Sequence, residues 1–414
     1  MPGPLTGVTV LDLSRVLAGP WCVQNLGDLG ADVIKIERPG LGDDARHWGP
    51  PWLADADGAP TRDSTYFLST NRNKRSIAVD IATPEGQALV CRLVADADVL
   101  MENYKVGDLA RYGLDWGPLS RINPRLIYCS LTGFGQDGPH ASRPGYDYLF
   151  QGMTGLMSIT GEPDDRPGGG PQRFGVPVVD LFTGMYATIA IVSALHHRHA
   201  TGTGQHIDVS LFDCALGLGS GPLLNYLANG RIPVRSGTVS PYIAPYAVLP
   251  CSDGQLILAC ANQAQFEAVC RVMGKPEWAT DPRFIDNQGR IAHQEELYAL
   301  LSEVFGTRTG AEWEDILLAV NVPCGPINNY AKVLEHPHVQ HRGTIVETPH
   351  ALGVAVRGVA SPMRFSDSPV EYRHAPPLLG QHTRELLVER LGISDEEMDK
   401  LEARGVIAGS KEAA

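Results

Sequence analysis

One aspartate, Asp180, stands where a carboxylate could act as a nucleophile. It follows the β-rich run of residues 176–179 and precedes the apolar segment 181–195. A carboxylate at such a strand-to-helix transition can cap the helix, which aspartate does well. It can also stay ionised beside the positive end of the helix dipole and attack an electrophile. The residues alone favour the cap, and the two roles are compatible.

Basic residues gather near two predicted strand ends. Arg38 follows the strand predicted for residues 32–37, and the basic run 71–75 lies just before the strand predicted for residues 76–81. Ligands of open α/β sheets bind beyond the carboxyl ends of parallel strands, which favours a binding role for Arg38. Such cations would suit the phosphates of a nucleotide-like ligand. The alternative is ordinary solvated loop charge.

Glycine and histidine clusters argue against two other kinds of site. The glycines within 133–135 and 152–155 do not form a G-x-G-x-x-G motif between the first strand and helix, so a nicotinamide-dependent dehydrogenase is not expected. The histidines within 196–206 follow a predicted helix end, where imidazole suits the helix dipole, and those within 336–341 lack cysteine or acidic partners at zinc spacing. We therefore expect no metal site.

The composition is typical of a globular protein of two or three domains, 414 residues long. The chain has 34 Lys and Arg residues against 47 Asp and Glu residues, and the net charge of −13 argues against nucleic acid and anionic membranes as partners. Eight scattered cysteines indicate a reducing compartment. The first residues lack a signal-peptide pattern, and the apolar segment 181–195 is too short to span a bilayer. We therefore expect a cytoplasmic protein with no membrane partner.

Alternating patterns predict the elements that position these residues. A strand at 8–13, a helix from 19 to 30 and a strand at 32–37 form a strand–helix–strand unit, which implies a parallel sheet. The pattern continues, and we predict an α/β fold with a Rossmann-like large domain. The later predicted elements are helices at 84–97, 107–114, 147–157 and 383–391, and strands at 99–102, 125–131 and 353–359.

The pattern of predicted secondary structure changes in the second half of the sequence. From about residue 223, short β runs alternate with amphipathic helices, which is typical of a smaller α+β domain. We therefore predict three parts. Residues 1–222 form the first part of the large domain together with a linker helix, residues 223–329 form the small α+β domain, and residues 330–414 return to complete the large domain.

Several segments together resemble the class III CoA-transferases, the CaiB/BaiF type that includes formyl-CoA transferase and carnitine CoA-transferase. The resemblance runs from Leu5 to Gly405. Residues 324–329 and 376–383 are most similar to the succinyl-CoA:glutarate CoA-transferase branch. The other matching segments are 11–20, 29–37, 73–76, 102–104, 145–147, 180–184 and 201–205.

The resemblance implies roles for individual residues, with a large domain that binds CoA. Asp180 falls on the family's nucleophile, and Trp48 falls on an active-site tryptophan. Leu17 stands where formyl-CoA transferase has Gln, so the formyl/oxalate pair is not expected. The implied CoA-binding residues are Val16, Leu17, Ala18, Arg38, Val79, Asp80, Ile81, Ala82, Asn103, Tyr104, Lys105, Arg111 and Arg143. The candidates for the acyl or acceptor pocket are Arg15, Arg46, Trp48, Arg72, Tyr146 and Asp147.

The implied reaction moves CoA from an acyl-CoA, in this branch succinyl-CoA, to a short dicarboxylic acid through an aspartyl-CoA thioester. CoA is then a substrate, no cofactor is required, and the implied assembly is an interlocked homodimer. One alternative is an α-methylacyl-CoA racemase. That enzyme uses a histidine where this chain has Tyr146, a poor general base at neutral pH. The other alternative is a non-catalytic acyl-CoA-binding protein, against which Asp180 argues.

Overall fold

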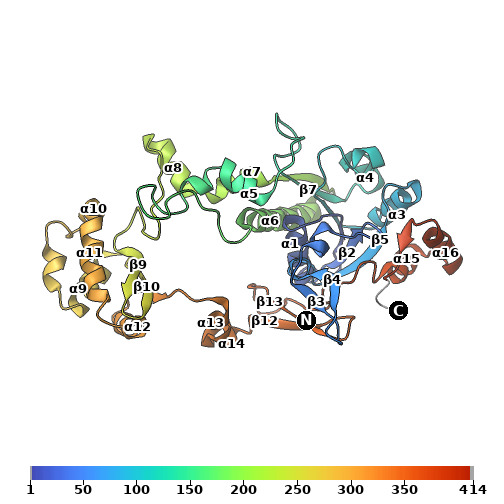
Figure 1. The fold of residues 1–414 in the computed structure, drawn as a ribbon. Coiled ribbons are helices and arrows are strands. Elements are labelled where there is room, and N and C mark those ends of the chain that lie inside the picture. The colour runs from blue at the N-terminus through green and yellow to red at the C-terminus, as the bar shows by residue number, and fades with distance from the viewer. Residues whose placement is uncertain (1, 411–414) are drawn as a thin grey trace. The chain divides into compact units, whose positions relative to one another are not determined.

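A seven-stranded sheet forms the core of the larger of two compact units in the computed structural model, which describes residues 2–410 (Figure 1). All adjacent strands pair in parallel except the edge strand β14, which is antiparallel to β5. The six parallel strands follow the 3-2-1-4-5-6 order of doubly wound folds, and the order reverses between β1 and β6. In spatial order the strands are β14 (Ile407–Ala408), β5 (Lys74–Val79), β2 (Asp32–Glu37), β1 (Thr9–Asp12), β6 (Val99–Glu102), β7 (Ile127–Thr132) and β8 (Gln205–Ser210).

Helices cover both faces of this sheet, because alternate strand residues point to opposite sides. Leu11 and Leu100 belong to one buried cluster, whereas their neighbours Val10 and Val99 belong to another. The first cluster includes side chains of α3 (Pro84–Val94), α4 (Trp116–Ile122), α15 (Thr383–Leu391) and α16 (Asp395–Ala403). The second includes side chains of α1 (Ala18–Asp28), α5 (Asp147–Met153), α6 (Val178–Thr201) and α7 (Leu211–Leu218). The α/β fold with a largely parallel sheet that the sequence predicts is confirmed.

The helix α6 begins at Val178 and contains the whole apolar segment 181–195, and its end at Thr201 is where the sequence predicts it. Gly202 ends the helix there with a φ of 78°. One side packs on α1, while Tyr186 and Ile189 on another side are exposed. Among the described helices, α6 is the one long and apolar enough to cross a membrane by length and composition, a test that core helices of other proteins also pass.

The predicted helix at residues 107–114 was wrong. Only a 3₁₀ turn, Ala110–Tyr112, forms there. Gly107 and Gly113 have φ values of 84° and 65°, and such left-handed residues interrupt a right-handed helix on both sides. The turn therefore stays in the loop that follows β6.

The described chain separates into two compact units. Within the described residues, one consists of residues 2–156, 174–228 and 343–410, and the other of residues 157–173 and 229–342. The second unit has an antiparallel sheet, β9 (Tyr246–Cys251), β10 (Gly254–Ala259) and β11 (Cys324–Pro326), with helices that include α9 (Gln263–Val272), α11 (Gln294–Phe305) and α12 (Gly310–Leu318). Phe266, Leu301 and Trp313 are central in its core. The remaining elements of the chain are η1 (Asp44–His47), β3 (Trp52–Ala54), β4 (Pro60–Ser64), α2 (Thr65–Leu68), η3 (Leu156–Ser158), α8 (Ser220–Asn229), η4 (Pro276–Thr280), α10 (Asn287–Ala292), α13 (Tyr330–Glu335), α14 (Pro337–Arg342), β12 (Ile345–Pro349) and β13 (Ala355–Val359).

Candidate active site

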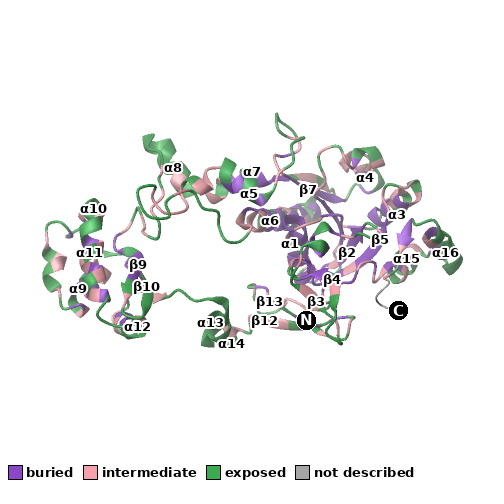
Figure 2. Ribbon diagram, viewed as in Figure 1, coloured by how far each residue is buried: buried purple, intermediate pink, exposed green. Residues whose placement is uncertain are grey.

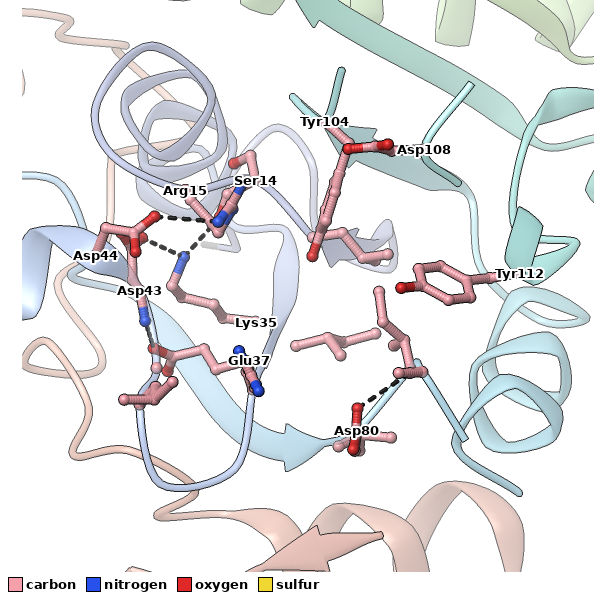
Figure 3. Close-up of a pocket in the computed structure, with 18 of the residues that line it drawn as sticks. Ser14, Arg15, Lys35, Glu37, Asp43, Asp44, Asp80, Tyr104, Asp108 and Tyr112 are labelled. Atoms are coloured by element: carbon pink, nitrogen blue, oxygen red, sulfur yellow. Dashed lines mark hydrogen bonds and ion pairs between the residues drawn. The ribbon is translucent and has the colours of Figure 1, made fainter. Parts of the chain in front are cut away.

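Two cavities lie at the carboxyl edge of the parallel sheet, where the strand order reverses. The first, of about 430 Å³, is lined by residues that follow β1, β2, β5 and β6 (Figure 3). The second, of about 220 Å³, is lined by residues that follow β1, β6 and β7 and by the start of α6. Arg15, Asp44, Tyr104 and Asp108 line both cavities. This edge is where doubly wound sheets bind their ligands.

The structure brings together the residues that the resemblance assigns to CoA. All of them line one of the two cavities. Arg38, Val79, Asp80, Ile81, Ala82 and Arg111 line the first, whereas Val16, Leu17, Ala18, Asn103, Lys105 and Arg143 line the second, and Tyr104 lines both. Tyr146 and Asp180 also line the second cavity.

Asp180 is the third residue of α6 and does not cap it. The N-cap position is Pro177, and no side chain caps this helix end. Asp147 binds the exposed amides instead, because its Oδ2 accepts hydrogen bonds from the backbone N–H of Val179 at 2.7 Å and of Asp180 at 3.1 Å. The other oxygen, Oδ1, accepts a hydrogen bond from Gln151 Nε2 at 2.6 Å. The Asp180 carboxylate is thereby left free to face the cavity.

The electrostatics of Asp180 differ from the expectation that a helix start keeps it ionised. Burial and the nearby charge of Asp147 raise the pKa of Asp180 from 3.8 to about 7. The helix amides that would have stabilised the negative charge are already bound by Asp147. Asp180 is therefore a destabilised carboxylate poised near neutral pH, as a side chain with a chemical role often is.

Tyr66 is a neighbour of Asp180 that the sequence did not indicate. Burial and the charges of Asp180 and Asp147 raise the pKa of Tyr66 to about 12, so its phenol stays protonated. The ring of Trp48 lies 5.3 Å from that of Tyr66, between centroids. The predicted pocket residue Trp48 lines neither cavity and packs on Tyr66 instead. Nothing in the pattern near Tyr66 distinguishes it from an ordinary helix residue.

Comparison with known proteins decides the family. The model of CoA-transferase family III matches residues 5–383. The chain belongs to this family. It is 47% identical to the succinate–glutarate CoA-transferase of Agrobacterium fabrum, over 93% of this chain and 95% of that protein. It is 41% identical to the human succinyl-CoA:glutarate CoA-transferase, over 98% and 90% of the two chains.

The solved structures agree with this assignment. A CaiB/BaiF family protein from Brucella suis superposes with a TM-score of 0.83 at 47% identity, over 94% of this chain and all of that one. The prediction of a class III CoA-transferase is confirmed, and CoA is its substrate.

Of the three arginines predicted for the acceptor pocket of this CoA-transferase, only Arg15 lines the Asp180 cavity. Arg46 is buried, with two hydrogen bonds to Glu37 at 2.8 Å and an ion pair with Asp63. Arg72 is buried in an ion pair with Asp28 at 2.6 Å. These guanidinium groups are already neutralised by carboxylates, so they stabilise the fold and do not contact the cavity.

The basic run 71–75 likewise forms ion pairs and hydrogen bonds within the fold. Lys74 is fully buried and its Nζ bonds Asp12, Pro20 and Asn71. Arg75 pairs with Asp32 at 2.9 Å. The phosphate-binding interpretation of this run was therefore wrong, because acidic and polar groups far apart in sequence surround it. Arg38, in contrast, is exposed at the first cavity and has no carboxylate partner within residues 2–410.

One of the clustered histidines, His206, takes a structural position in this enzyme. His206 stacks on Trp116, with ring centroids 5.9 Å apart, and its Nε2 lies 2.9 Å from Ser130 Oγ. Across residues 2–410, no three His, Cys, Asp or Glu side chains are close enough together to bind a metal ion.

Proposed function

We propose that this CoA-transferase moves CoA from succinyl-CoA to a short dicarboxylic acid through a covalent CoA thioester of Asp180. The observation that carries the proposal is the position of the Asp180 carboxylate, which lines a cavity at the reversal point of the sheet beside the turn 16–18. Its neighbours in that cavity, Asn103, Tyr104 and Lys105, come from the loop after β6. The chain's relatives in Agrobacterium and human are named for succinate or succinyl-CoA and glutarate, which supports the choice of acids.

The proposed chemistry uses one carboxylate as both attacking and leaving group. Asp180 attacks the thioester carbonyl, the C–S bond breaks, and a mixed anhydride and CoA thiolate result. The thiolate then attacks the aspartyl carbonyl carbon, which forms aspartyl-CoA and releases the donor acid as its carboxylate. The acceptor carboxylate attacks aspartyl-CoA in turn, and the released thiolate attacks the acceptor's acyl carbon. Asp180 leaves as a carboxylate, so no net proton is consumed.

The raised pKa of Asp180 suits this role. A buried carboxylate next to Asp147 is destabilised as an anion. Conversion to a neutral anhydride or thioester removes that destabilisation. The first bond-forming step is therefore more favourable in free energy than it would be for a solvated aspartate. Tyr66 stays protonated beside it and can donate a hydrogen bond to a developing negative charge.

The first cavity is proposed to bind the nucleotide part of CoA. Arg38 and Arg111 line it, and the exposed Arg111 pairs with the half-buried Asp108 at 3.1 Å. Exposed cations of this kind can bind phosphates, because a surface ion pair is weak and easily exchanged. The shared lining residues Arg15 and Tyr104 connect this cavity to the one with Asp180.

Arg15 is the proposed contact of the acceptor's second carboxylate. Its Nη1 pairs with Asp44 at 3.0 Å, and its guanidinium lies over the Tyr104 ring at 4.9 Å. Its side chain is 42% exposed, so the guanidinium N–H groups that Asp44 does not bind can reach a ligand in the cavity. A carboxylate can accept hydrogen bonds from two guanidinium nitrogens together.

The test compares glutarate with valerate, which lacks the second carboxylate. Wild type should use glutarate better by on the order of a hundredfold in kcat/KM. Arg15→Met should remove that preference, whereas Arg143→Met, a control in the same cavity, should retain it and weaken acyl-CoA use. Equal use of both acids by wild type would end the dicarboxylate proposal. Loss of the preference in Arg143→Met alone would move the contact to Arg143.

An interlocked homodimer is the proposed assembly, with the chain leaving the large domain after residue 222 and returning from residue 330. The supporting observation is apolar surface. Figure 2 shows α8 largely exposed, and Leu224 and Leu227 in it are 65% and 70% exposed. Tyr186 and Ile189 of α6 are exposed as well. Exposed apolar side chains such as these support an interface with a second copy of the chain.

Interlocked chains cannot separate while folded. Dimer dissociation, followed by light scattering, should therefore coincide with loss of helical circular dichroism during denaturant titration. A folded monomer on dilution would contradict the interlocked arrangement.

A further inference from the structure

The turn after β1 contains a strained residue. Val16 has a φ of +73°, in the left-handed region. The other two non-glycine residues with positive φ within residues 2–410 are Asn73 and Asn321, and asparagine tolerates this conformation. A β-branched valine does not, so the surrounding structure must impose it.

Asp43 is the side chain that bonds this turn. Its Oδ1 accepts hydrogen bonds from the backbone N–H of Val16 at 2.9 Å and of Ala45 at 3.0 Å. Its Oδ2 lies 3.0 Å from Lys35 Nζ, and both side chains are fully buried. Figure 3 shows Lys35 and Asp43 next to Ser14 and Arg15. The aspartate thus uses one oxygen for two amides and the other for a cation.

Two further contacts restrain the same turn. Lys35 Nζ donates to the carbonyl oxygen of Ser14 at 2.9 Å. Asn103 accepts from the N–H of Arg15 at 2.9 Å and donates to the carbonyl oxygen of Arg15 at 2.7 Å. Burial lowers the pKa of Lys35, but Asp43, Asp12 and Glu37 raise it to about 12, so the lysine stays charged. Residues 14–16 are therefore fixed from three sides.

The turn of residues 14–16 sets the position of one wall of the Asp180 cavity. Val16, Leu17 and Ala18 line that cavity with Asp180. A Cβ added to Gly184 of α6 would lie 2.6 Å from the carbonyl oxygen of Ala18. The helix that carries Asp180 thus packs on the first turn of α1, and a shift of the turn would move one relative to the other.

We propose that Asp43 is a positioning residue for CoA transfer: it holds Val16 in the left-handed conformation and so sets the wall of the cavity that contains Asp180. The inference rests on the proposed role of Asp180, because the transfer assay reads its effect. Without Asp43, Val16 would relax to a negative φ and displace Leu17 and Ala18.

The test is a double-mutant cycle with Asp43→Asn and Val16→Gly. Asparagine has a single carbonyl oxygen, so either Lys35 or the amides of Val16 and Ala45 lose their acceptor. Glycine adopts positive φ without strain and needs no side chain to hold it there. Asp43→Asn should lower kcat by on the order of tenfold in the Val16 background, but by less than about threefold in the Val16→Gly background.

An equal loss of kcat in both backgrounds would overturn the proposal, because a general structural role does not depend on the residue at position 16. Thermal unfolding of all four proteins checks the fold. If Asp43→Asn does not fold, Val16→Gly and Val16→Ala decide: glycine should give the higher Tm, the reverse of the order at an unstrained position. A higher Tm for Val16→Ala would overturn the proposal. Activity of Asp180→Asn tests the nucleophile separately, and its outcome does not change the coupling between positions 16 and 43.

Discussion

The ionisation of Asp180 should control the pH dependence of transfer. With a pKa of about 7, the carboxylate is ionised to about 10% at pH 6 and about 90% at pH 8. We therefore expect kcat/KM for the acyl-CoA to rise about tenfold over this range, with a midpoint near 7. Initial rates at low acyl-CoA and saturating acceptor measure this directly. Calorimetric binding of CoA over the same range corrects for titration of the ligand's own phosphate, whose pKa is near 6.

Asp147→Asn isolates the contribution of the neighbouring charge. The variant retains a carbonyl oxygen for the amides of Val179 and Asp180 but removes the negative charge, while burial remains. The midpoint should therefore fall to a value between the ordinary 3.8 and 7. Gln151→Met is the matched control, because it removes a polar neighbour of Asp147 without changing charge. A wild-type rate that is flat from pH 6 to 8, or a midpoint that rises in Asp147→Asn, would refute the electrostatic account.

Three further outcomes are expected. Because its folded-state pKa is raised, Asp180 destabilises the folded state increasingly as pH rises from about 4 to 7, whereas at lower pH it is protonated in both states and carries no penalty. Asp180→Asn should thus raise the free energy of unfolding at pH 8 by roughly 2–4 kcal/mol in urea titrations, and by almost nothing near pH 4; an equal gain at both would contradict this. Incubation with a 2-methylacyl-CoA in deuterated water should show no α-exchange by mass spectrometry, since Tyr146 is a poor base. Arg46→Met should lower Tm by several degrees, because it strands Glu37 in the core, and an unchanged Tm would argue against the buried pair.

Local patterns in the sequence predict the sheet well. The strands at 32–37 and 99–102 and the helix at 383–391 occur as predicted. The reason is that crossover units depend on short-range periodicity and turn residues, which a single sequence displays. The cavity at the sheet edge follows from topology, so the motifs after β1 and β6 could be placed there in advance.

Long-range charge partners could not be predicted. Arg72 and Arg46 look like ligand-binding cations in sequence, but their carboxylates, Asp28 and Glu37, come from other elements. Asp147 binds the amide of Asp180 from 33 residues away, which reverses the expected effect of the helix start on its pKa. The conformation of Val16 depends on Asp43 and has no local signal, since valine predicts an extended residue.

The central claim is that CoA becomes covalently bound to Asp180. Enzyme incubated with succinyl-CoA in the absence of acceptor, then quenched in acid and digested, should yield a peptide containing Asp180 with the mass of CoA as a thioester. Addition of glutarate before the quench should remove that adduct and form glutaryl-CoA. The Asp180→Asn variant, with its fold checked by circular dichroism, should show neither adduct nor transfer. Transfer at the wild-type rate by that variant, or a CoA adduct on another residue, would contradict the account.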